Sequence, residues 1–357
     1  MGLEIINLNT ERQRIRWNKI VKSFKKSNIY YNFHYLLACK LHGDGEPLLF
    51  YYKKDEKEIC IAVLKNKISE FKKFKNITFK KELYDISTPY GYGGFLFNDE
   101  EKISDDFVEK FFNEFKKYCL ENNIVSLFIR FNPVEKNHIL VENFCNIVNL
   151  KKTVYICTTS KEEILKNMSI RCRRNVKKAN KLNTTIKIDK GENLKDFLRL
   201  YYSTMKKNNA ENYYYFNESY FEYFIKNMKD KFLFFSAINE NKIIASIMLI
   251  YDKYIAYYHL GGTNQQYRHF SPMSLVLYEA AIWVCKSKIE KFYLGGGVNF
   301  QDSLFEFKKN FNKNESLDFY IGRIIFSKKE FNYLLDLRKK NDNNFNICND
   351  YLISYRA

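Results

Sequence analysis

The chain has few residues of the kinds that form linkers, metal sites or common catalytic motifs. Only 4 of its 357 residues are proline, and no stretch rich in proline or in glycine and serine divides it. Its 5 histidines are isolated and show no metal-ligand spacing, and the HExxH, P-loop, GxGxxG and GxSxG patterns do not occur. We therefore expect no metal centre and no loosely tethered domains.

Signals for export and for membrane insertion are also lacking. Residues 1–10 contain no basic segment followed by an apolar one, and no apolar run approaches the length needed to cross a bilayer. The 8 cysteines form no CxxC pair, and several lie within apolar runs, which favours buried thiols in a reducing compartment. We expect a cytoplasmic protein.

Apolar residues and positive charge are abundant. A length of 357 residues exceeds what one hydrophobic core usually organises, and an apolar content of 46%, with 28 Tyr and 32 Phe, can fill two cores. Lys and Arg outnumber Asp and Glu by 59 to 41, which favours polyanionic partners such as tRNA, anionic lipid or a diphosphate-bearing precursor. Because Asn, Ile, Tyr and Phe are also abundant, a coding bias could raise lysine everywhere, and only clustered charge is informative.

An internal repeat replaces the missing linker. Residues 46–66 and 231–252 each read as an apolar strand, a short polar turn and a second apolar strand, which predicts two β-hairpins.

The same order of elements follows each hairpin: a segment with glycine, an amphipathic helix and a strand. These segments are 89–94, 107–118 and 125–131 in the first half, and 261–262, 275–285 and 291–294 in the second. The order predicts a mixed α/β sheet in each half. A final strand at 319–326 and an amphipathic stretch at 331–337 end the chain's regular pattern.

The helix at 275–285 has a recognisable start. Ser271 is a plausible N-cap and Pro272 a plausible first helical residue. The free N–H groups of such a helix end can bind a phosphate or polarise a carbonyl, although any capped helix shows the same signs.

A glycine run precedes the most informative lysine. Gly295, Gly296 and Gly297 follow a short strand and allow a close approach of the backbone to a ligand, or simply a flexible loop. In the next segment, 302–311, Leu304, Phe307 and Phe311 are expected to share an apolar helix face with Lys308 at its edge, and Asp302 is a weak candidate for a general base. A lysine held there could stabilise an oxyanion, whereas most such lysines extend their amine to solvent.

Basic residues are densest at 170–181, which contains no acid. A Ser160–Glu163 capping box precedes the segment. A polyanion-binding surface such as a tRNA site and a solvated face are both consistent with its six cations, which are Arg171, Arg173, Arg174, Lys177, Lys178 and Lys181.

Aromatic residues alternate with Lys and Asn in 201–216. Three consecutive tyrosines, 213–215, cannot all face one interior, so some are available to line a polar groove. His259 lies in an apolar run and is expected to be a core residue rather than a base.

Taken together, these segments resemble the FemABX family of the GNAT acyltransferase superfamily. The resemblance rests on five segments in the family's order and spans about two-thirds of the chain: 88–94, 171–181, 204–216, 258–263 and 294–311. It implies an α/β (α+β) fold of two tandem GNAT-like domains, each a mixed, mostly antiparallel sheet flanked by helices. The domains would be 1–150 and 151–321, with a tail, 322–357, that packs back on the first.

The resemblance also implies an activity. An aminoacyl group would pass from a charged tRNA to an amine of a peptidoglycan precursor, without a covalent enzyme intermediate. Lys308 would be the catalytic cation with Phe307 beside it, and Lys207 would hold a precursor phosphate. Tyr90 and Tyr92 would line a groove between the domains, and the remaining substrate-binding residues would be Tyr215, Tyr258, Gly295, Gly296 and Gly297.

Two departures keep other functions open. The long helical hairpin of some family members is missing, and residues 265–274 contain no glycine, which argues against ordinary coenzyme A binding in the second half. The alternatives are an acyl-CoA-dependent N-acyltransferase for an amino sugar or amino acid of a surface polysaccharide, and a non-catalytic module that binds tRNA or a lipid precursor. We expect no tightly bound cofactor, with aminoacyl-tRNA or acyl-CoA as co-substrate. Expected partners are tRNA, a peptidoglycan or surface-glycan precursor and the inner face of the membrane.

Overall fold

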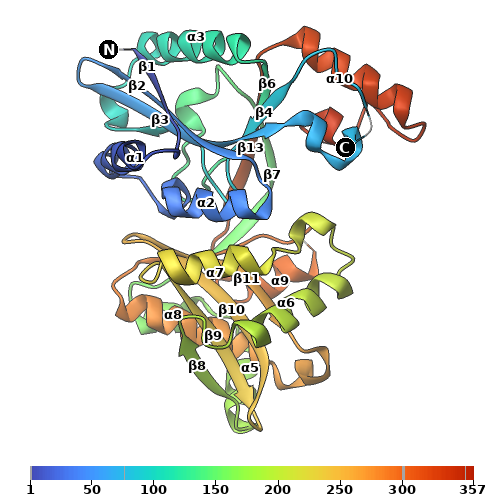
Figure 1. Ribbon diagram of the computed structural model, residues 1–357. Coiled ribbons are helices and arrows are strands. Elements are labelled where there is room, and N and C mark those ends of the chain that lie inside the picture. Colours follow the sequence, from blue (N-terminus) through green and yellow to red (C-terminus); the bar gives the residue numbers. More distant parts are fainter. Residues whose placement is uncertain (1, 76, 300–301, 350) are drawn as a thin grey trace. The chain divides into compact units, whose positions relative to one another are not determined.

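The structure is a computed structural model that describes residues 2–75, 77–299, 302–349 and 351–357 (Figure 1). The chain forms two compact units. The first contains the segments up to Leu150 and from Phe319 to Ala357, and the second is Lys151–Asp318. Each unit is described by itself.

The first unit is a mixed sheet with helices on both faces. Its sheet has the order β1-β2-β3-β4-β6-β13, with β5 beside β3, and only β4 and β6 are parallel neighbours. The strands are β1 (Leu3–Ile6), β2 (Glu46–Lys54), β3 (Lys57–Lys67), β4 (Tyr84–Ser87), β5 (Leu96–Phe97), β6 (Ile124–Arg130) and β13 (Leu317–Ile325). The helices are α1 (Glu11–Ser23), α2 (Phe33–His42), α3 (Asp105–Glu121) and α10 (Lys328–Asn341).

Alternation along β2 separates the two faces of this sheet. Phe50 packs against Phe115 of α3, with ring centroids 4.7 Å apart, and both belong to one buried cluster. Helices α1 and α2 cover the other face (Figure 1), where the buried Trp17 of α1 donates a hydrogen bond from Nε1 to the Tyr31 carbonyl at 2.9 Å. The α3 face is the apolar helix face that the periodicity of 107–118 predicts.

The second unit repeats this plan. Its strands have the order β7-β12-β11-β10-β9-β8, and only β11 and β12 are parallel neighbours. The strands are β7 (Asn146–Cys157), β8 (Thr185–Asp189), β9 (Phe232–Asn239), β10 (Lys242–Tyr251), β11 (Ile255–Thr263) and β12 (Lys291–Gly295). The helices are α4 (Lys161–Asn167), α5 (Ile170–Lys181), α6 (Leu194–Lys207), α7 (Glu218–Asn227), α8 (Pro272–Lys286) and α9 (Ser303–Lys309).

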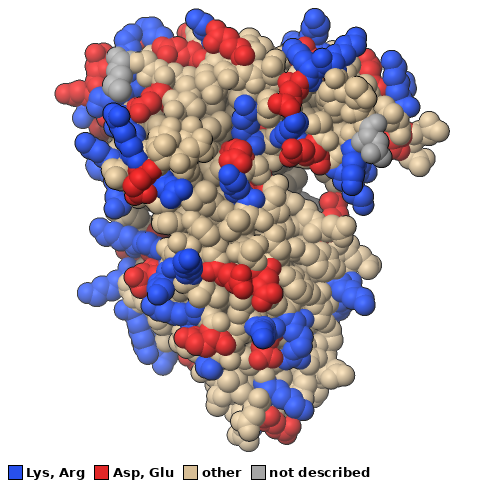
Figure 2. Space-filling model, viewed as in Figure 1, with Lys and Arg blue, Asp and Glu red and all other residues tan. Residues whose placement is uncertain are grey.

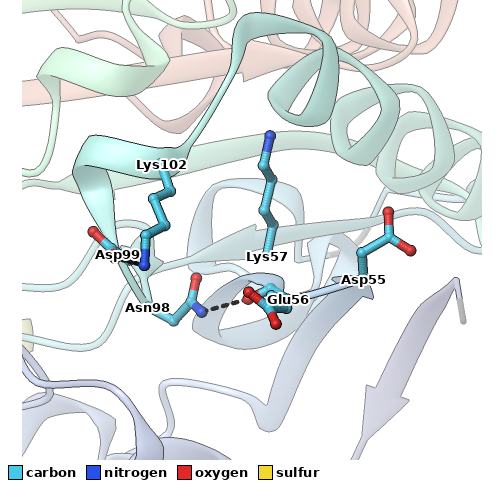
Figure 3. Close-up of a pocket in the computed structure, with 6 residues that line it drawn as sticks. All are labelled: Asp55, Glu56, Lys57, Asn98, Asp99 and Lys102. Carbon is cyan, nitrogen blue, oxygen red and sulfur yellow. Dashed lines mark hydrogen bonds and ion pairs between the residues drawn. The ribbon is translucent and has the colours of Figure 1, made fainter.

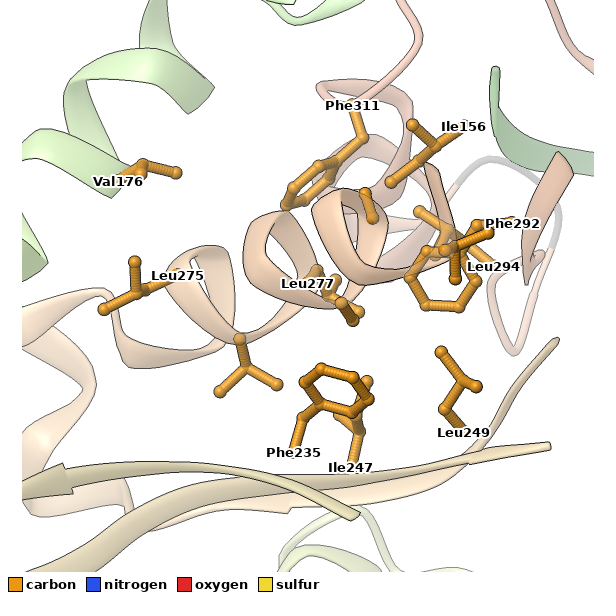
Figure 4. Close-up of a cluster of buried hydrophobic side chains, with 14 of the residues drawn as sticks. Ile156, Val176, Phe235, Ile247, Leu249, Leu275, Leu277, Phe292, Leu294 and Phe311 are labelled. Carbon is orange, nitrogen blue, oxygen red and sulfur yellow. The ribbon is translucent and has the colours of Figure 1, made fainter. Parts of the chain in front are cut away.

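Neighbouring residues of β9 show that helices cover both faces of the second sheet. Phe234 packs against Phe197 of α6 at 4.8 Å between ring centroids, whereas Phe235 contacts Trp283 of α8 at 6.1 Å. Figure 4 shows the core on the α8 side, where Phe235 lies beneath Leu277. Because successive strand residues point to opposite faces, a sheet covered on both faces needs the mostly apolar sequences 232–238 of β9 and 243–250 of β10.

The repeat predicted from the sequence is therefore confirmed. Hairpins β2–β3 and β9–β10 both form, and each leads to a strand, a helix and a parallel strand. The second hairpin turns through Glu240 and Asn241, both with positive φ, as a two-residue hairpin turn requires. Each sheet has one further strand outside this repeat: β13 pairs with β6, and β7 pairs with β12.

The tail of the chain packs in the first unit. Leu334 of α10 is buried in a cluster with Val125 of β6. The Tyr355 hydroxyl donates to the buried Asp85 carboxylate at 2.9 Å, and the Arg356 guanidinium forms an ion pair with the same carboxylate. A buried carboxylate with these partners ties the end of the chain to β4.

The start of α8 differs in one respect from the predicted N-cap. Ser271 stands at the N-cap of α8 with Pro272 following, but its side chain makes no capping hydrogen bond because its backbone is left-handed, with φ +57°.

All 8 cysteines are free, and only Cys348 is exposed. In the described part of the chain, no helix combines the length and apolarity that a bilayer crossing needs.

Helix α6 lies against the backbone of β11 at Gly262. A Cβ there would come within 2.4 Å of the Leu200 carbonyl carbon and oxygen. We predict that Gly262→Ala lowers the free energy of unfolding by about 1–3 kcal/mol, because the helix must move away. Urea denaturation measures the change. Gly43→Asn is the control, since this exposed left-handed position has no atom near its Cβ and should change stability by less than about 0.5 kcal/mol. Equal effects of the two changes would contradict the prediction.

Candidate functional site

The glycine run forms a tight loop at the end of β12. Gly295 has a φ of +74°, which turns the chain out of the strand. A Cβ on Gly297 would lie 1.9 Å from Oδ1 of Asp302, so only glycine allows that carboxylate to reach the loop. The sequence predicted a close approach here; the group that approaches is the protein's own Asp302.

Asp302 is the N-cap of α9 and also binds the loop. Its Oδ2 accepts hydrogen bonds from the N–H groups of Val298 and Asn299 in the loop, at 2.7 and 2.9 Å. Its Oδ1 accepts from the N–H groups of Leu304 and Phe305 in α9, at 3.0 and 2.9 Å. Burial acts to raise the pKa of this carboxyl, but the four N–H donors outweigh it, and the pKa is lowered. A carboxylate satisfied in this way suits a structural anchor and is a poor proton acceptor.

Lys308 is enclosed beneath the loop. Only 7% of the residue is exposed, and its Nζ donates to the Gly296 carbonyl at 2.7 Å. The ammonium group lies 5.4 Å from the centroid of the Tyr258 ring. Burial and the like charge of Lys151 lower the pKa of Lys308 to about 7, against the opposing effect of Asp302. Lysine at this position does not extend into bulk solvent.

A second lysine, which the sequence interpretation missed, holds the same loop. Nζ of Lys151 donates to the Gly297 carbonyl at 2.6 Å and to the Val298 carbonyl at 3.2 Å. Burial lowers the pKa of Lys151, while Asp302 raises it. Lys151 lies on β7, more than 140 residues before the loop, and no local pattern in the sequence marks it.

The two lysines bind carbonyl groups of the loop, whereas two of its N–H groups are bound by no described residue. They bind the carbonyls of three consecutive residues, Gly296, Gly297 and Val298. Among the described residues, no acceptor binds the N–H of Gly296 or Gly297. A buried ammonium group beside unoccupied N–H donors can stabilise a negative charge that develops on a bound acyl group.

The strand below the loop carries a bulge. Met248 and Leu249 of β10 pair with Leu260 and Tyr258, so His259 is an extra residue in β11. Burial raises the pKa of Tyr258 to about 12, which keeps its hydroxyl neutral.

His259 is a core residue, as predicted. Its Nε2 shares a 2.7 Å hydrogen bond with the Tyr220 hydroxyl, and burial lowers its pKa to about 3. A histidine that stays neutral in a closed contact has no accessible role as a base.

The predicted apolar face of α9 needs one correction. Leu304 is 37% exposed, and the buried residue of the first turn is Phe305. Helix α9 has only seven residues, and capping by Asp302 sets its rotation so that Phe305 faces the core. Phe307, expected beside the catalytic lysine, is partly buried and packs on Phe311 with ring centroids 5.7 Å apart.

Two other predicted substrate-binding residues lie elsewhere in the second unit. Lys207 is exposed at the end of α6, and its Nζ donates to Oε1 of Gln265 at 2.6 Å. Gln265 lies just after Thr263, the last residue of β11, whereas Tyr258 lies earlier on the same strand. Tyr215 stacks on Tyr202 with ring centroids 6.0 Å apart. Lys207 and Lys308 therefore have different hydrogen-bond acceptors, the side chain of Gln265 and the carbonyl of Gly296.

Tyr90 and Tyr92 belong to the first unit. The Tyr90 carbonyl accepts from the Tyr35 hydroxyl at 2.5 Å, and the Tyr92 ring lies edge-on to Tyr30 and Phe319 at 5.5 Å. Both tyrosines are half-buried. Their predicted place in a groove between domains stays a prediction.

The six cations of 170–181 all lie on α5. Arg173 donates to the Leu165 carbonyl at 3.0 Å and is half-buried, whereas the other five are exposed. Ser160 accepts from the Glu163 N–H at 3.1 Å, which confirms half of the predicted capping box. Basic and acidic side chains are interspersed over most of the face in Figure 2, so clustered charge is the exception.

A hollow of about 540 Å³ lies in the first unit at the turn between β2 and β3 (Figure 3). Its side chains hold the turn itself: Asn98 donates to the Glu56 carbonyl at 2.7 Å, and Lys102 pairs with Asp99 at 3.0 Å. The hollow is open to solvent and is lined by charges of both signs, and its lining residues show no arrangement that suits catalysis. Nor do three or more His, Cys, Asp or Glu residues of the described chain cluster as metal ligands would.

Comparisons with known proteins place the fold. The second unit matches the family model described as an acetyltransferase (GNAT) domain over residues 166–309, which include Lys308. No curated protein sequence matches the chain significantly. The predicted fold of two tandem GNAT-like domains is confirmed by solved structures of the same architecture, and the family model together with these structures supports an acyltransferase.

Three solved structures are similar over almost their whole length. FemX has a TM-score of 0.66 and 12% identity, covering 92% of this chain and 99% of that one. The C-terminal domain of a putative lysylphosphatidylglycerol synthetase from Agrobacterium fabrum has a TM-score of 0.54 and 12% identity, covering 92% and 94%. A tandem GNAT protein of the clavulanic acid biosynthesis pathway has a TM-score of 0.51 and 4% identity, covering 92% and 99%.

The two lysines should titrate as neighbours. We predict that Lys151→Met raises the pKa of Lys308 above about 7, because a like charge is removed. NMR titration of lysines labelled at Cε, with Lys308→Arg to assign the signal, measures the change. Lys152→Met is the control, since Lys152 forms an ion pair with Asp318 instead. An unchanged or lower pKa in Lys151→Met would contradict the arrangement.

Proposed function

We propose that this chain is an acyltransferase that forms an amide on an amine of a cell-envelope precursor, taking an aminoacyl group from a charged tRNA. The observation that carries the proposal is the buried ammonium group of Lys308 beside the Gly295–Gly297 loop. The similarity of the fold to FemX supports the choice of donor and acceptor.

The reaction needs no covalent enzyme intermediate. The nitrogen of the acceptor, present as the free amine, adds to the acyl carbon, and the carbonyl oxygen becomes an oxyanion. Lys308 and the N–H groups of Gly296 and Gly297 stabilise that charge. The intermediate then collapses: the C–O bond to the ribose breaks, the amide remains, and the proton lost by nitrogen leaves with the ribose hydroxyl.

The protonation of Lys308 fits this role. With a pKa of about 7, the free protein holds the ammonium and amine forms in comparable amounts near neutral pH. A nearby negative charge favours the ammonium form, so an oxyanion would draw a proton to Lys308 as it develops. The Gly296 carbonyl keeps the side chain in place before that moment.

The remaining predicted residues find roles away from the reacting atoms. Lys207 would hold a phosphate of the acceptor, since its exposed Nζ donates to a neutral partner, Gln265, and pairs with no acid among the described residues. Tyr215 would contact the same ligand from the segment that follows α6. Phe307 and Tyr258 would form the apolar wall beside Lys308.

The alternative donor is acyl-CoA, with an amino sugar or amino acid as acceptor. The acetyltransferase family model favours it. The start of α8 does not, because Pro272 supplies no N–H and the preceding residues 264–271, which include the short 3₁₀ helix Gln265–Phe270, contain no glycine.

Donor use separates the two activities. We expect purified protein to consume aminoacyl-tRNA when an amine-bearing envelope precursor is present, with the label moving to the precursor. Acyl-CoA should remain intact, as measured by release of free thiol. Consumption of acyl-CoA alone would replace the first proposal by the second, and failure with both donors would favour a binding module.

Replacing Lys308 tests the mechanism. We expect Lys308→Ala to lower kcat/KM on the order of 10²- to 10³-fold with little change in donor binding, because it removes charge stabilisation at the oxyanion. Lys309→Ala is the control, since its Nζ donates to the Glu315 carbonyl instead. Equal losses in the two variants, or loss of binding alone, would contradict the role.

The pH dependence tests the charge. The ammonium form predominates below about pH 7 in the free protein, so kcat/KM should fall as the pH rises through that value. In Lys308→Arg the charge persists, and the falling limb should move to higher pH. A limb that stays in place would show that another group titrates.

A further inference from the structure

Helix α5 has one buried face and one basic face. Its buried residues, Cys172, Val176 and Ala179, belong to the core of the second unit. At 100° per residue, the positions of Arg171, Arg174, Lys178 and Lys181 fall together on the opposite side. All four are exposed, and Lys177 lies at the edge of this stripe.

No acidic residue of the described chain pairs with the stripe. Within the described chain, Arg171, Arg174, Lys177, Lys178 and Lys181 make no salt bridge or hydrogen bond through their side chains. Basic residues elsewhere in the unit do find acids: Lys166 pairs with Glu163, Lys152 with Asp318 and Lys190 with Asp230. Like charges one turn apart repel, so the stripe costs stability unless an anionic partner neutralises it.

Exposed apolar side chains flank the stripe. Ile170 precedes it and is 62% exposed, and Leu182 follows it and is 37% exposed. Ile188, on the edge strand β8, is 45% exposed and shares a strand face with Ile186, which packs on the core cluster that contains Val176. Large exposed apolar residues at both ends of a basic helix are a second observation, independent of charge.

We propose that this surface, made of the α5 stripe with Ile170, Leu182 and Ile188, docks on an anionic lipid membrane. Basic residues meet the charged headgroups, and the apolar residues enter the interface between headgroups and acyl chains. An RNA partner would use the charges but not the apolar residues, and α5 carries no aromatic residue to stack on bases. The proposal does not depend on which acyl donor the chain uses.

The test is flotation of the full-length protein with vesicles of phosphatidylcholine, with and without 30% phosphatidylglycerol. We expect binding to the anionic vesicles only, weakened by added salt. Each basic residue near such a surface changes partitioning about fivefold. The variant Arg171→Gln, Arg174→Gln, Lys178→Gln, Lys181→Gln should therefore lose roughly two to three orders of magnitude in binding.

Two further variants separate the contributions. A control with the same net charge, Lys116→Gln, Lys117→Gln, Lys339→Gln, Lys340→Gln, changes exposed positions of α3 and α10 and should bind as wild type. Ile170→Ser with Leu182→Ser should weaken vesicle binding roughly tenfold while leaving tRNA binding, measured by gel shift, unchanged.

Several outcomes would overturn the proposal. These are no binding of wild type to anionic vesicles, equal losses in the stripe variant and its control, or a stripe variant that keeps vesicle binding and loses tRNA binding. The last result would assign the stripe to nucleic acid. Circular dichroism of each variant checks that it is folded. A chain without acyltransferase activity would still bind vesicles, so failure of the proposed function is distinguishable.

Discussion

The site depends on one buried hydrogen bond, from Nζ of Lys308 to the carbonyl of Gly296. An ammonium group taken out of water loses several kcal/mol of hydration, and that loss is what brings the pKa of this lysine near neutrality. The hydrogen bond holds the side chain at the loop whether the Lys308 amine is protonated or neutral, because both forms carry an N–H donor. Burial without such a partner would leave a costly unpaired amine.

The rest of the second unit provides the surroundings that this bond requires. Asp302 anchors both the loop and the start of α9, which fixes the turn on which Lys308 lies. Lys151 reaches the loop from β7, the strand that pairs with β12. The sheet can place Lys151 there because β7, which enters the second unit at this residue, pairs with β12.

Sequence reasoning predicted the fold better than the site. Hairpins and helices with strong periodicity were confirmed because local patterning is enough to specify them. The position of Lys308 after a glycine run led to the prediction that it is the catalytic cation, and the structure shows that its amine is buried. Lys151 could not be predicted, since its role depends on a strand pairing that no local pattern encodes. The predicted rotation of α9 about its axis was wrong, because Leu304 is exposed. The Asp302 cap, rather than the spacing of apolar residues, sets that rotation.

The central claim is that Lys308 gains a proton as negative charge develops on the acyl oxygen. Calorimetry can detect this with a phosphonate that mimics the tetrahedral addition intermediate of an aminoacyl ester. At pH 8 most of the free protein holds the neutral amine, because its pKa is about 7. Binding heats measured in two buffers of different ionisation enthalpy should therefore report uptake of nearly one proton. In Lys308→Met, this proton uptake and much of the affinity should be lost. Binding of equal strength in both proteins, with no difference in proton uptake, would contradict the account.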